Sequence, residues 1–434
     1  SDGHIRCITN ICIKKMVKVS ECFLLQRNIG IRFAETRCCK TMDKYDYIIA
    51  GAGCAGLSLL HYIHQDSSLH QKKILIIDQN LKKSNDRTWC FWEEGSSDFE
   101  SLLTTSWNTI SIHQADRNFY LPTAPFTYKM IEGLSFYESI IAKARQSENI
   151  EWKEVKIESI NDQIVYWEGG AATAKYIFSS ILQYNPVFKD ANSIYELNDL
   201  AKRYTVKPFL WQHFKGVTVE FNNEVFDPSC ARWMDFNVDQ QKATAFMYVL
   251  PIHKKKALVE YTVFSKYILD KKDYDDSINS FIALHYPNQT YTILHEEFGA
   301  IPMTQNSFSS GQTSGYIPIG TIGGAVKAST GFAFKSIQEQ TKKIAAALSK
   351  GEQPTAVLKK TRHSFYDAVL LDILYNDKMS GAEIFTRIFS KNKAATVFRF
   401  LSNTSSIFDD IKIMVTLPTR LFLFTAIRVL LRWK

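Results

Sequence analysis

The stretch YIIAGAGCAGLSLLHYI, residues 47–63, indicates how the chain starts to fold. Residues 47–50 are apolar, as expected for a buried strand, and they lead directly into Gly51, Gly53 and Gly56. The residues that follow keep apolar side chains at helical spacing. A strand, a glycine-rich turn and a helix in this order form the first half of a dinucleotide-binding unit.

A second apolar run, residues 74–77, ends in Asp78 and completes the unit. In this interpretation Gly51 permits a tight turn, Gly53 lets the backbone approach a pyrophosphate, and Gly56 allows the helix to pack closely on the strand. The helix N-terminus then faces the phosphates, and Asp78 accepts hydrogen bonds from ribose hydroxyls. A turn of the same shape that binds no nucleotide is the weaker alternative.

The composition excludes several classes of protein. At 434 residues the chain can form two or three packed units. Its net charge of +8 is modest, and we expect no nucleic-acid partner. Beyond residue 41 only three cysteines remain, far apart, which favours a reducing compartment without disulfides.

His61 and His64 lie one helical turn apart with no third ligand in register, so we interpret them as surface histidines and predict no metal site.

Residues 1–41 differ from the rest of the chain. They carry eight basic residues and show weak periodicity, which makes a targeting peptide one interpretation. Their acidic residues and scarce serines argue against it, and we expect native translation to begin at Met42, where the ordered pattern starts. No uninterrupted apolar stretch in the sequence reaches the length of a membrane span.

The run ALVEYTVF, residues 257–264, places an acidic residue on an apolar strand face. Alternation puts Glu260 on the same face as Leu258 and Phe264, and no cation lies within two residues. With residues 243–251 and a polar turn, this run predicts an antiparallel hairpin. Glu260 is therefore either an exposed acid at a strand edge or a buried acid kept for chemistry.

Eight motifs along the chain carry a family resemblance. They are NDRTWCFWEEG (85–95), QHFKGVTVEF (212–221), RWMDFNVDQ (232–240), AFMYVLPI (245–252), ALVEYT (257–262), EEFGAIPMT (296–304), IGTIGGAVKASTGFAF (319–334) and FYDAVLLDIL (365–374). In this order they resemble the flavin-dependent lycopene β-cyclases, most of all their bacterial branch. The resemblance extends from Tyr45 to about Leu401.

The resemblance implies an α/β flavoprotein and a reaction. The expected fold has an FAD-binding Rossmann-type lobe, an inserted β-rich substrate lobe and a helical C-terminal region. The expected activity closes the ψ-ends of lycopene into β-ionone rings, by way of γ-carotene to β-carotene. The reaction is an isomerisation without net redox change, but it needs reduced FAD, with NAD(P)H as the reductant. The implied partners are lycopene, γ-carotene, a membrane lipid surface on the cytoplasmic side and other enzymes of the carotenoid pathway.

The resemblance also assigns cofactor residues. The positions that match the family's flavin site are Gly51, Gly53, Gly56, Asp78, Arg87, Gly320, Gly323, Gly324, Ser329, Thr330 and Gly331. Related hydroxylases commonly have aspartate after the glycine at position 320, whereas this chain has Thr321. That difference speaks against a monooxygenase.

Glu260 matches the essential acid of the family. Plant members have a second glutamate directly after it, where this chain has Tyr261. Protonation of an alkene needs a neutral acid, and burial can raise the pKa of a glutamate from ~4.3 by up to ~3–5 units. We therefore expect Glu260 to be the proton donor, although reduced flavin could also pass the proton. Glu297, or its neighbour Glu296, could act as a base or pocket acid, or could simply be exposed.

Other side chains are candidates by position. Aromatic residues make up 13% of the chain and can line an apolar cavity or fill a core. Those proposed to stabilise a carbocation are Trp211, Trp233, Phe236, Phe246 and Tyr248. Reduced flavin would supply a fixed negative charge beside that cation. For Asp235 we favour a structural role as a polar anchor.

The domain boundaries follow from these motifs. We expect an extension over 1–41, an FAD-binding lobe over 42–200 with a small β meander, a substrate lobe over 201–292, a return to the FAD lobe over 293–345 and a helical region over 346–434. Beyond Asp410 the chain has no acids but has Lys412, Arg420, Arg428, Arg432 and Lys434. On a helix starting near Pro418 the last four would share one broad face, leaving the opposite face apolar. This predicts a tail lying in a bilayer interface, or alternatively a helix packed on the body.

Two other functions stay open on the sequence alone. A redox flavoenzyme of the same fold, either a hydroxylase or a prenyl reductase, would consume reductant and change the mass of its substrate. A flavin-binding carotenoid carrier without catalysis would bind the polyene and release it unchanged.

Overall fold

The computed structural model describes residues 42–80, 82–161, 163–181, 207–306, 315–355 and 361–432. The predictions made for residues 1–41 and for Lys434 fall outside these ranges. Residues 43–434 form one unit by themselves.

The first sheet carries the predicted dinucleotide-binding unit. Its strands are β1 (Asp43–Ala50), β2 (Ile74–Asp78), β8 (Ile150–Glu154), β9 (Ile157–Asn161), β10 (Ile164–Trp167), β11 (Gly170–Ser179) and β17 (Tyr316–Pro318). The order is β8-β2-β1-β11-β10-β9, with β17 also paired to β11. β1 runs parallel to both β2 and β11, so the expected strand–turn–helix–strand unit is present. β9, β10 and β11 form the predicted antiparallel meander.

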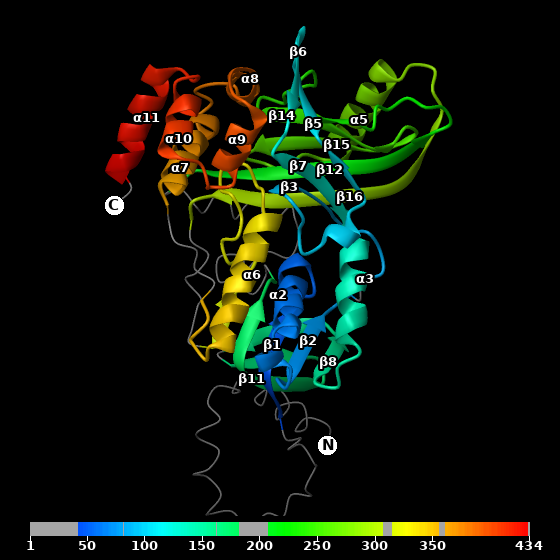
Figure 1. Ribbon diagram of the computed structural model, residues 1–434, viewed down its shortest axis with the longest axis vertical. Coiled ribbons are helices and arrows are strands. Elements are labelled where there is room, and N and C mark those ends of the chain that lie inside the picture. The colour runs from blue at the N-terminus through cyan, green and yellow to red at the C-terminus, as the bar shows by residue number, and fades with distance from the viewer. Residues whose placement is uncertain are drawn as a thin grey trace, which may run out of the picture. The chain divides into compact units, whose positions relative to one another are not determined.

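Helices run alongside this sheet. They are α2 (Cys54–Gln65), α3 (Gly133–Ala144) and α6 (Phe334–Ser349), which lie side by side in Figure 1. Two short 3-10 helices span Ser67–Leu69 and Glu100–Leu102. His61 of α2 is buried, at 8% exposure, against Phe99, so its interpretation as a surface histidine was wrong. The helix buries it because its inner face is wider than the apolar spacing alone indicated.

The second sheet is larger and mostly antiparallel. Its strands are β5 (Thr109–Gln114), β6 (Arg117–Pro122), β12 (Phe209–Phe221), β13 (Cys230–Asp235), β14 (Thr244–His253), β15 (Lys256–Ser265) and β16 (Tyr291–Thr304). The order is β16-β12-β15-β14-β13-β5-β6, and β14 and β15 form the predicted hairpin. A third sheet has the order β3-β7-β4, with β3 (Thr88–Glu94), β7 (Phe126–Glu132) and β4 (Thr105–Trp107).

The lobes are more interleaved than the predicted boundaries. β5 and β6 come from the predicted FAD-binding segment, yet β5 pairs with β13 in the second sheet. β16 stays paired with β12 as far as Thr304, beyond the predicted boundary at residue 292. In the part of the chain that the structure describes, the return to the first sheet comes at β17, which pairs with β11. These strands were misassigned because long-range pairing, which local pattern does not reveal, decides their sheet.

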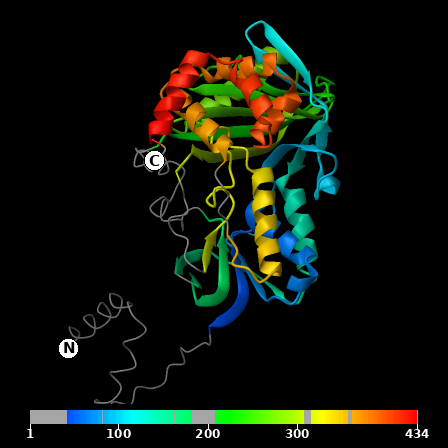
Figure 2. The ribbon, with the colours of Figure 1, turned by 60° about the vertical axis from the view of Figure 1, so that its left-hand side comes forward.

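Helices cover both faces of the second sheet. On one face α5 (Lys271–His285) packs over the cluster that contains Val259, Tyr261 and Val263. On the other face, where Leu258 and Phe264 point, lie the C-terminal helices, which Figure 2 shows in orange and red beside the green strands. They are α7 (Arg362–Tyr375), α8 (Gly381–Lys391), α9 (Ala394–Leu401), α10 (Ile407–Met414) and α11 (Thr419–Arg432).

The last helix packs on the body, as the alternative interpretation expected, and its charged face differs from the prediction. α11 begins just after Pro418, as expected, but Thr425 and Val429 are buried and α11 packs along α7. Arg428 points to this packed side and donates to both carboxylate oxygens of Asp372 at 3.0 Å. The outward face is mainly apolar, so the single basic face was wrong. No helix among the described residues is long and apolar enough to cross a membrane.

Candidate active site

Two glutamates lie in one row across the second sheet. Glu260 on β15 and Glu297 on β16 both pair with Gly216, which lies on β12 between them. Tyr248 on β14 pairs with Glu260 and extends the row. Directly paired residues of antiparallel strands point to the same face, so all four positions face the C-terminal helices. Strands lie about 4.8 Å apart, which puts the two glutamate backbones roughly 10 Å from each other.

Gly216 leaves a gap between the two acids. A Cβ atom there would lie 3.0 Å from Leu258 Cδ1 and 3.1 Å from Glu297 Cγ, both tighter than ordinary contacts. With no side chain at this position, the carboxyl groups can lean toward each other over the backbone of β12. Neither the need for a small residue here nor the row itself is visible in the local sequence pattern.

Glu260 is an acid that the fold keeps from ionising easily. Its side chain retains part of its accessible surface, and the Thr262 hydroxyl donates a hydrogen bond to its Oε1 at 2.7 Å. Burial, followed by the negative charge of Glu297, raises the pKa of Glu260 to about 8, although the Thr262 hydroxyl opposes the rise. The environment predicted from Leu258 and Phe264 is therefore present.

Glu297 is more deeply enclosed. Its side chain is 5% exposed, and within the part of the chain described neither carboxyl oxygen has a hydrogen-bond partner. Burial raises the pKa of Glu297 to about 7, with Thr88 and Arg87 acting in the opposite direction. Glu296, one residue earlier on β16, is exposed and pairs with Lys215 at 2.9 Å. Strand alternation thus decides which of the two glutamates belongs to the site.

The two carboxyl groups titrate as a pair. Each has a pKa raised to near or above neutrality, and ionisation of one disfavours ionisation of the other. At pH 7 the pair therefore keeps at least one proton. An acid of this kind can give a proton to a weak base such as an alkene, and its ionised partner can accept one.

Four of the five candidate aromatic residues share the face of the two acids. Trp233, Phe236, Phe246 and Tyr248 belong to the apolar cluster between the sheet and the C-terminal helices. Trp233 stacks on Phe332, with ring centroids 6.0 Å apart. Trp211 is the exception, because it pairs with Ser265, which shares a face with Tyr261 on the α5 side. The sheet therefore separates Trp211 from Glu260.

Asp235 has the structural role that we favoured. It is 1% exposed, forms an ion pair with Arg232 at 3.0 Å and accepts a hydrogen bond from the Asn237 backbone. Held by this ion pair and this backbone hydrogen bond, Asp235 anchors the end of β13.

The first glycine turn has the geometry of a phosphate cradle. Gly51 has a φ of +99°, and a Cβ atom on Gly56 would lie 1.9 Å from the Gly51 carbonyl oxygen, so only glycine fits there. The space beside Gly53 is open. Asp78 accepts from the Ala52 backbone at 2.7 Å, which fixes the acid at the turn.

The second glycine segment meets the first. A Cβ atom on Gly320 would lie 2.7 Å from Ala55 Cβ in the first turn of α2. Gly324 has a φ of +79° and open space beside it, whereas Gly323 packs against the carbonyl of Pro318. The two segments, far apart in sequence, thus form one cradle of backbone amides at a helix N-terminus, which suits a dinucleotide.

Polar groups at the far end of this segment also suit a bound ring. The Thr330 hydroxyl is buried without a hydrogen-bond partner among the described residues, and Gly331 has a φ of +72°. Arg87 donates to the Phe298 carbonyl at 2.6 Å and so joins the start of β3 to the strand that carries Glu297. The residues assigned to flavin thus border the row of acids. They fit a flavin dinucleotide.

Two contacts in this region were missed by sequence reasoning. Lys327 and Asp367 form a buried ion pair at 2.8 Å, and Ser329 donates to the same carboxylate at 2.7 Å. They fasten the glycine segment to α7. An apolar segment with one lysine gave no signal for this pairing, because the partner lies on a distant helix.

A cavity of about 270 Å³ opens between this segment and the C-terminal helices. Its lining includes Ser329, Thr330 and Phe332 of the glycine segment. The rest is lined by Met234, Phe365, Tyr366, Asp367, Val369, Leu370, Ile384, Phe385, Ile388, Phe389, Val397, Phe400, Leu401, Ile413, Met414, Leu417, Thr419, Phe422, Leu423 and Ala426. Phe264, which flanks Glu260, packs against Phe385 with centroids 6.2 Å apart. The cavity and the acids therefore belong to one apolar region.

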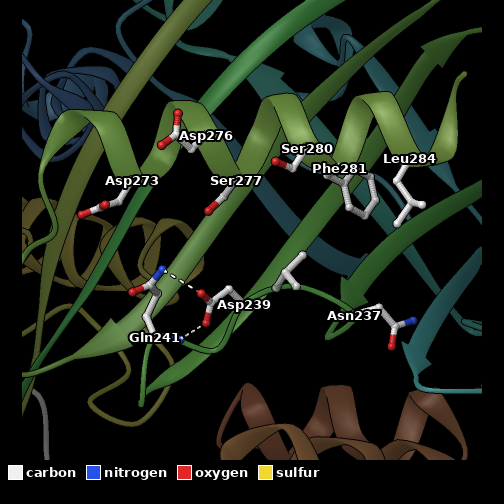
Figure 3. Close-up of a pocket in the computed structure, with 10 residues that line it drawn as sticks. Asn237, Asp239, Gln241, Asp273, Asp276, Ser277, Ser280, Phe281 and Leu284 are labelled. Carbon is white, nitrogen blue, oxygen red and sulfur yellow. Dashed lines mark hydrogen bonds between the residues drawn. The ribbon is translucent and has the colours of Figure 1, made fainter. Parts of the chain in front are cut away.

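A second pocket lies on the opposite side of the sheet. Its volume is about 390 Å³, and α5 and the loop that contains Asp239 line it, as Figure 3 shows. Asp239 accepts from Gln241 there, and the other labelled groups are small and polar apart from Phe281 and Leu284. It is remote from the glycine cradle, and we assign it no chemistry.

Comparisons with known proteins agree with this geometry. The family model described as lycopene cyclase protein matches residues 46–426. A flavoprotein/dehydrogenase from Cytophaga hutchinsonii has a TM-score of 0.53 at 10% identity, covering 86% of this chain and 99% of its own. A geranylgeranyl bacteriochlorophyll reductase-like protein from Thermoplasma acidophilum has a TM-score of 0.51 at 11% identity, covering 88% and 96%. No curated protein sequence matches the chain. The fold is thus that of FAD-binding flavoproteins, as predicted.

Proposed function

Because the chain belongs to the lycopene cyclase family, we propose that it is a lycopene β-cyclase, an isomerase that closes the ψ-ends of lycopene. The observation that carries the proposal is the pair of carboxyl groups with raised pKa values, Glu260 and Glu297, facing an apolar aromatic region. A redox flavoenzyme has no need for such an acid pair. Ring closure of a polyene needs an acid that protonates an alkene and a base that removes a different proton, and the pair can supply both.

The two acids divide the proton transfers. In its neutral form Glu260 gives its proton to the terminal alkene, which leaves a tertiary carbocation that the next double bond attacks to close the ring. Glu297 is proposed to accept the different proton that the ring then loses. The sum leaves the composition of the substrate unchanged. The shared proton of the pair keeps the donor loaded near neutral pH.

The aromatic residues exclude water and stabilise the cation. Trp233, Phe246 and Tyr248 lie on the same face as the acids, and each aromatic face can stabilise a desolvated cation by ~2 kcal/mol. Their apolar rings exclude water from the cation and so protect it from hydration. Product then leaves with a ring and without an added hydroxyl.

The glycine cradle is proposed to hold FAD. Gly51, Gly53 and Gly56 would take the pyrophosphate, Asp78 the ribose, and the segment from Gly320 to Gly331 the flavin ring. Reduced flavin, regenerated by NAD(P)H, would supply negative charge beside the cation without a net redox change. The lipid-dissolved substrates, lycopene and γ-carotene, fit an enzyme held at the cytoplasmic surface of a membrane, where other carotenoid enzymes also act.

Expression in a lycopene-accumulating host tests the proposal. Ring-containing carotenoids of unchanged mass are expected, and their absence with well-expressed, flavin-loaded protein would reject the cyclase. Product of changed mass would identify a hydroxylase or prenyl reductase, and bound but unaltered polyene would identify a carrier.

A matched pair of variants tests the acids. Glu260→Gln should retain flavin but lose ring formation by at least 100-fold, whereas Glu296→Gln on the exposed side of β16 should retain it. Equal activity in both variants would exclude Glu260 as the proton donor.

A further inference from the structure

Two consecutive helices present apolar stripes to the outside. The exposed members on and next to α10 are Ile407, Phe408, Ile411, Met414 and Val415, and those on α11 are Leu423, Phe424, Ile427, Leu430 and Leu431. Both sets have the spacing i, i+1, i+4, i+7 and i+8, which is one face of a helix. They account for ten of the sixteen large hydrophobic side chains that are exposed among the described residues, so the exposure is concentrated here.

The opposite sides of these helices are firmly attached to the body. Asp410 of α10 is 1% exposed and accepts from Arg362 at 2.7 Å, and Arg428 of α11 is held by the buried Asp372. Each helix therefore already has an inner face that packs on the body. Its apolar outer side is exposed in addition to that face. The outward stripes are a second, separate surface.

The charges beside the stripes are positive. Lys412 and Arg420 are exposed and form no ion pair with any described residue. The only acids of the two helices, Asp409 and Asp410, are paired with arginines or buried. An apolar surface bordered by free cations is complementary to a layer of acyl chains under anionic headgroups.

The cavity reaches this surface. Met414 and Leu423 line the cavity and also belong to the two exposed stripes, one on each helix. The seam between α10 and α11 is therefore a mouth. Thr330 and Phe332 of the glycine segment line the same cavity.

We propose that α10 and α11 together lie in the interface of an anionic lipid bilayer and open the cavity directly into its acyl-chain layer. With 8 and 14 residues, the helices are too short to span and are suited to lie in the plane of the membrane. The docking stands on the surface alone. The passage of a polyene through the mouth rests on the proposed function.

Vesicle sedimentation of the full, flavin-loaded chain tests the docking. Vesicles of phosphatidylcholine with phosphatidylglycerol are the probe, and the double variant Phe408→Glu/Phe424→Glu should weaken binding by at least tenfold. Leu284→Glu, at an exposed leucine of α5, is the control and should bind as the unaltered protein does. Circular dichroism and retained flavin show that the variants fold.

Two further results show whether the cations contribute to binding and whether lipid or a second copy of the chain covers the apolar stripes. Lys412→Glu/Arg420→Glu should weaken binding to anionic vesicles and leave little dependence on salt. Unchanged vesicle binding by the folded Phe408→Glu/Phe424→Glu variant would overturn the proposal. So would a protein that ignores vesicles but changes from dimer to monomer in that variant, because the stripes would then be a surface between two copies.

The mouth is tested with the substrate dissolved in the vesicles. Leu423→Trp should keep vesicle binding and slow cyclisation at least fivefold, whereas Leu284→Trp should leave it unchanged. Equal rates would overturn the passage through this seam. If the unaltered protein forms no rings at all, the proposed function fails, and the sedimentation result still decides the docking.

Discussion

Replacement of Glu260 by glutamine is expected to make the protein more stable while it abolishes ring formation. A protonated glutamate and a glutamine have nearly the same shape, and the Thr262 hydroxyl can still hydrogen-bond to the amide. The substitution removes a carboxyl group that could ionise at a desolvated position, because glutamine cannot become negatively charged. Activity and stability should therefore change in opposite directions.

The magnitude follows from the pKa. The folded state raises the pKa of Glu260 from an ordinary value of 4.5 to about 8, so the folded protein holds the proton more tightly than the unfolded chain. A group of this kind contributes its full stability below pH 4.5 and loses it as the pH rises toward 8. At 1.36 kcal/mol per unit, the unaltered protein loses about 3 kcal/mol between pH 4.5 and pH 7 and about 5 kcal/mol by pH 8. The glutamine variant escapes that loss.

Thermal unfolding at several pH values measures the effect. An unfolding entropy of about 2 cal/mol/K per residue converts 3 kcal/mol into a rise in Tm of roughly 4 °C for a unit of this length. The gain of Glu260→Gln over the unaltered protein should be small at pH 5 and largest at pH 8. Glu296→Gln, an exposed acid on the next strand but one, should show no such pH dependence.

A Tm difference that stays constant between pH 5 and pH 8 would refute the reasoning. So would a variant less stable than the unaltered protein at pH 8, since Glu260 would then be a paired, ionised structural residue. Either outcome would also remove the basis for a loaded proton donor.

Three other changes probe the same site. Glu297→Gln removes the like charge that helps to raise the pKa of Glu260, so the residual cyclisation should fall off at a lower pH, which a pH–rate profile detects. Gly216→Ala places a Cβ atom 3.0 Å from Leu258 and 3.1 Å from Glu297, and ring formation should drop about tenfold while flavin stays bound. Gly56→Ala forces a contact with the first turn and should lose flavin, which the visible absorbance per mole of protein reports; retained flavin would show that this turn does not hold the cofactor.

Local pattern was sufficient for the elements that are built from neighbouring residues. The first glycine turn could be predicted because the close contact that requires glycine, between Gly56 and the Gly51 carbonyl, lies within one strand–turn–helix unit. The β14–β15 hairpin and the face occupied by Glu260 followed from strict alternation. In each case the residues that interact are close in sequence.

Other features depended on strand register. Glu297 could not be separated from Glu296 until β16 was paired with β12, and Trp211 could not be assigned a face until β12 was paired with β15. Gly216 acquired a meaning only when acids from two other strands lay on either side of it. A shift of register by one residue would turn each of these side chains to the other face.

The orientation of the C-terminal helix α11 also depended on a residue far away in the sequence. The sequence predicted a helix after Pro418 and correctly noted its basic residues. It could not show that Asp372, on α7, turns Arg428 inward and leaves the apolar stripe outside.

The amino-acid sequence by itself determined the dinucleotide-binding unit, the family and the acid at position 260, because the short-range spacing of glycines, apolar residues and motifs encodes them. Only the tertiary structure decided that a second acid lies in the same row as Glu260, that a glycine keeps the space between them clear, and that residues of an exposed apolar surface also line the cavity. Those features arise where segments far apart in the chain come together, and the side chains that meet there carry no mark of one another in their local sequence.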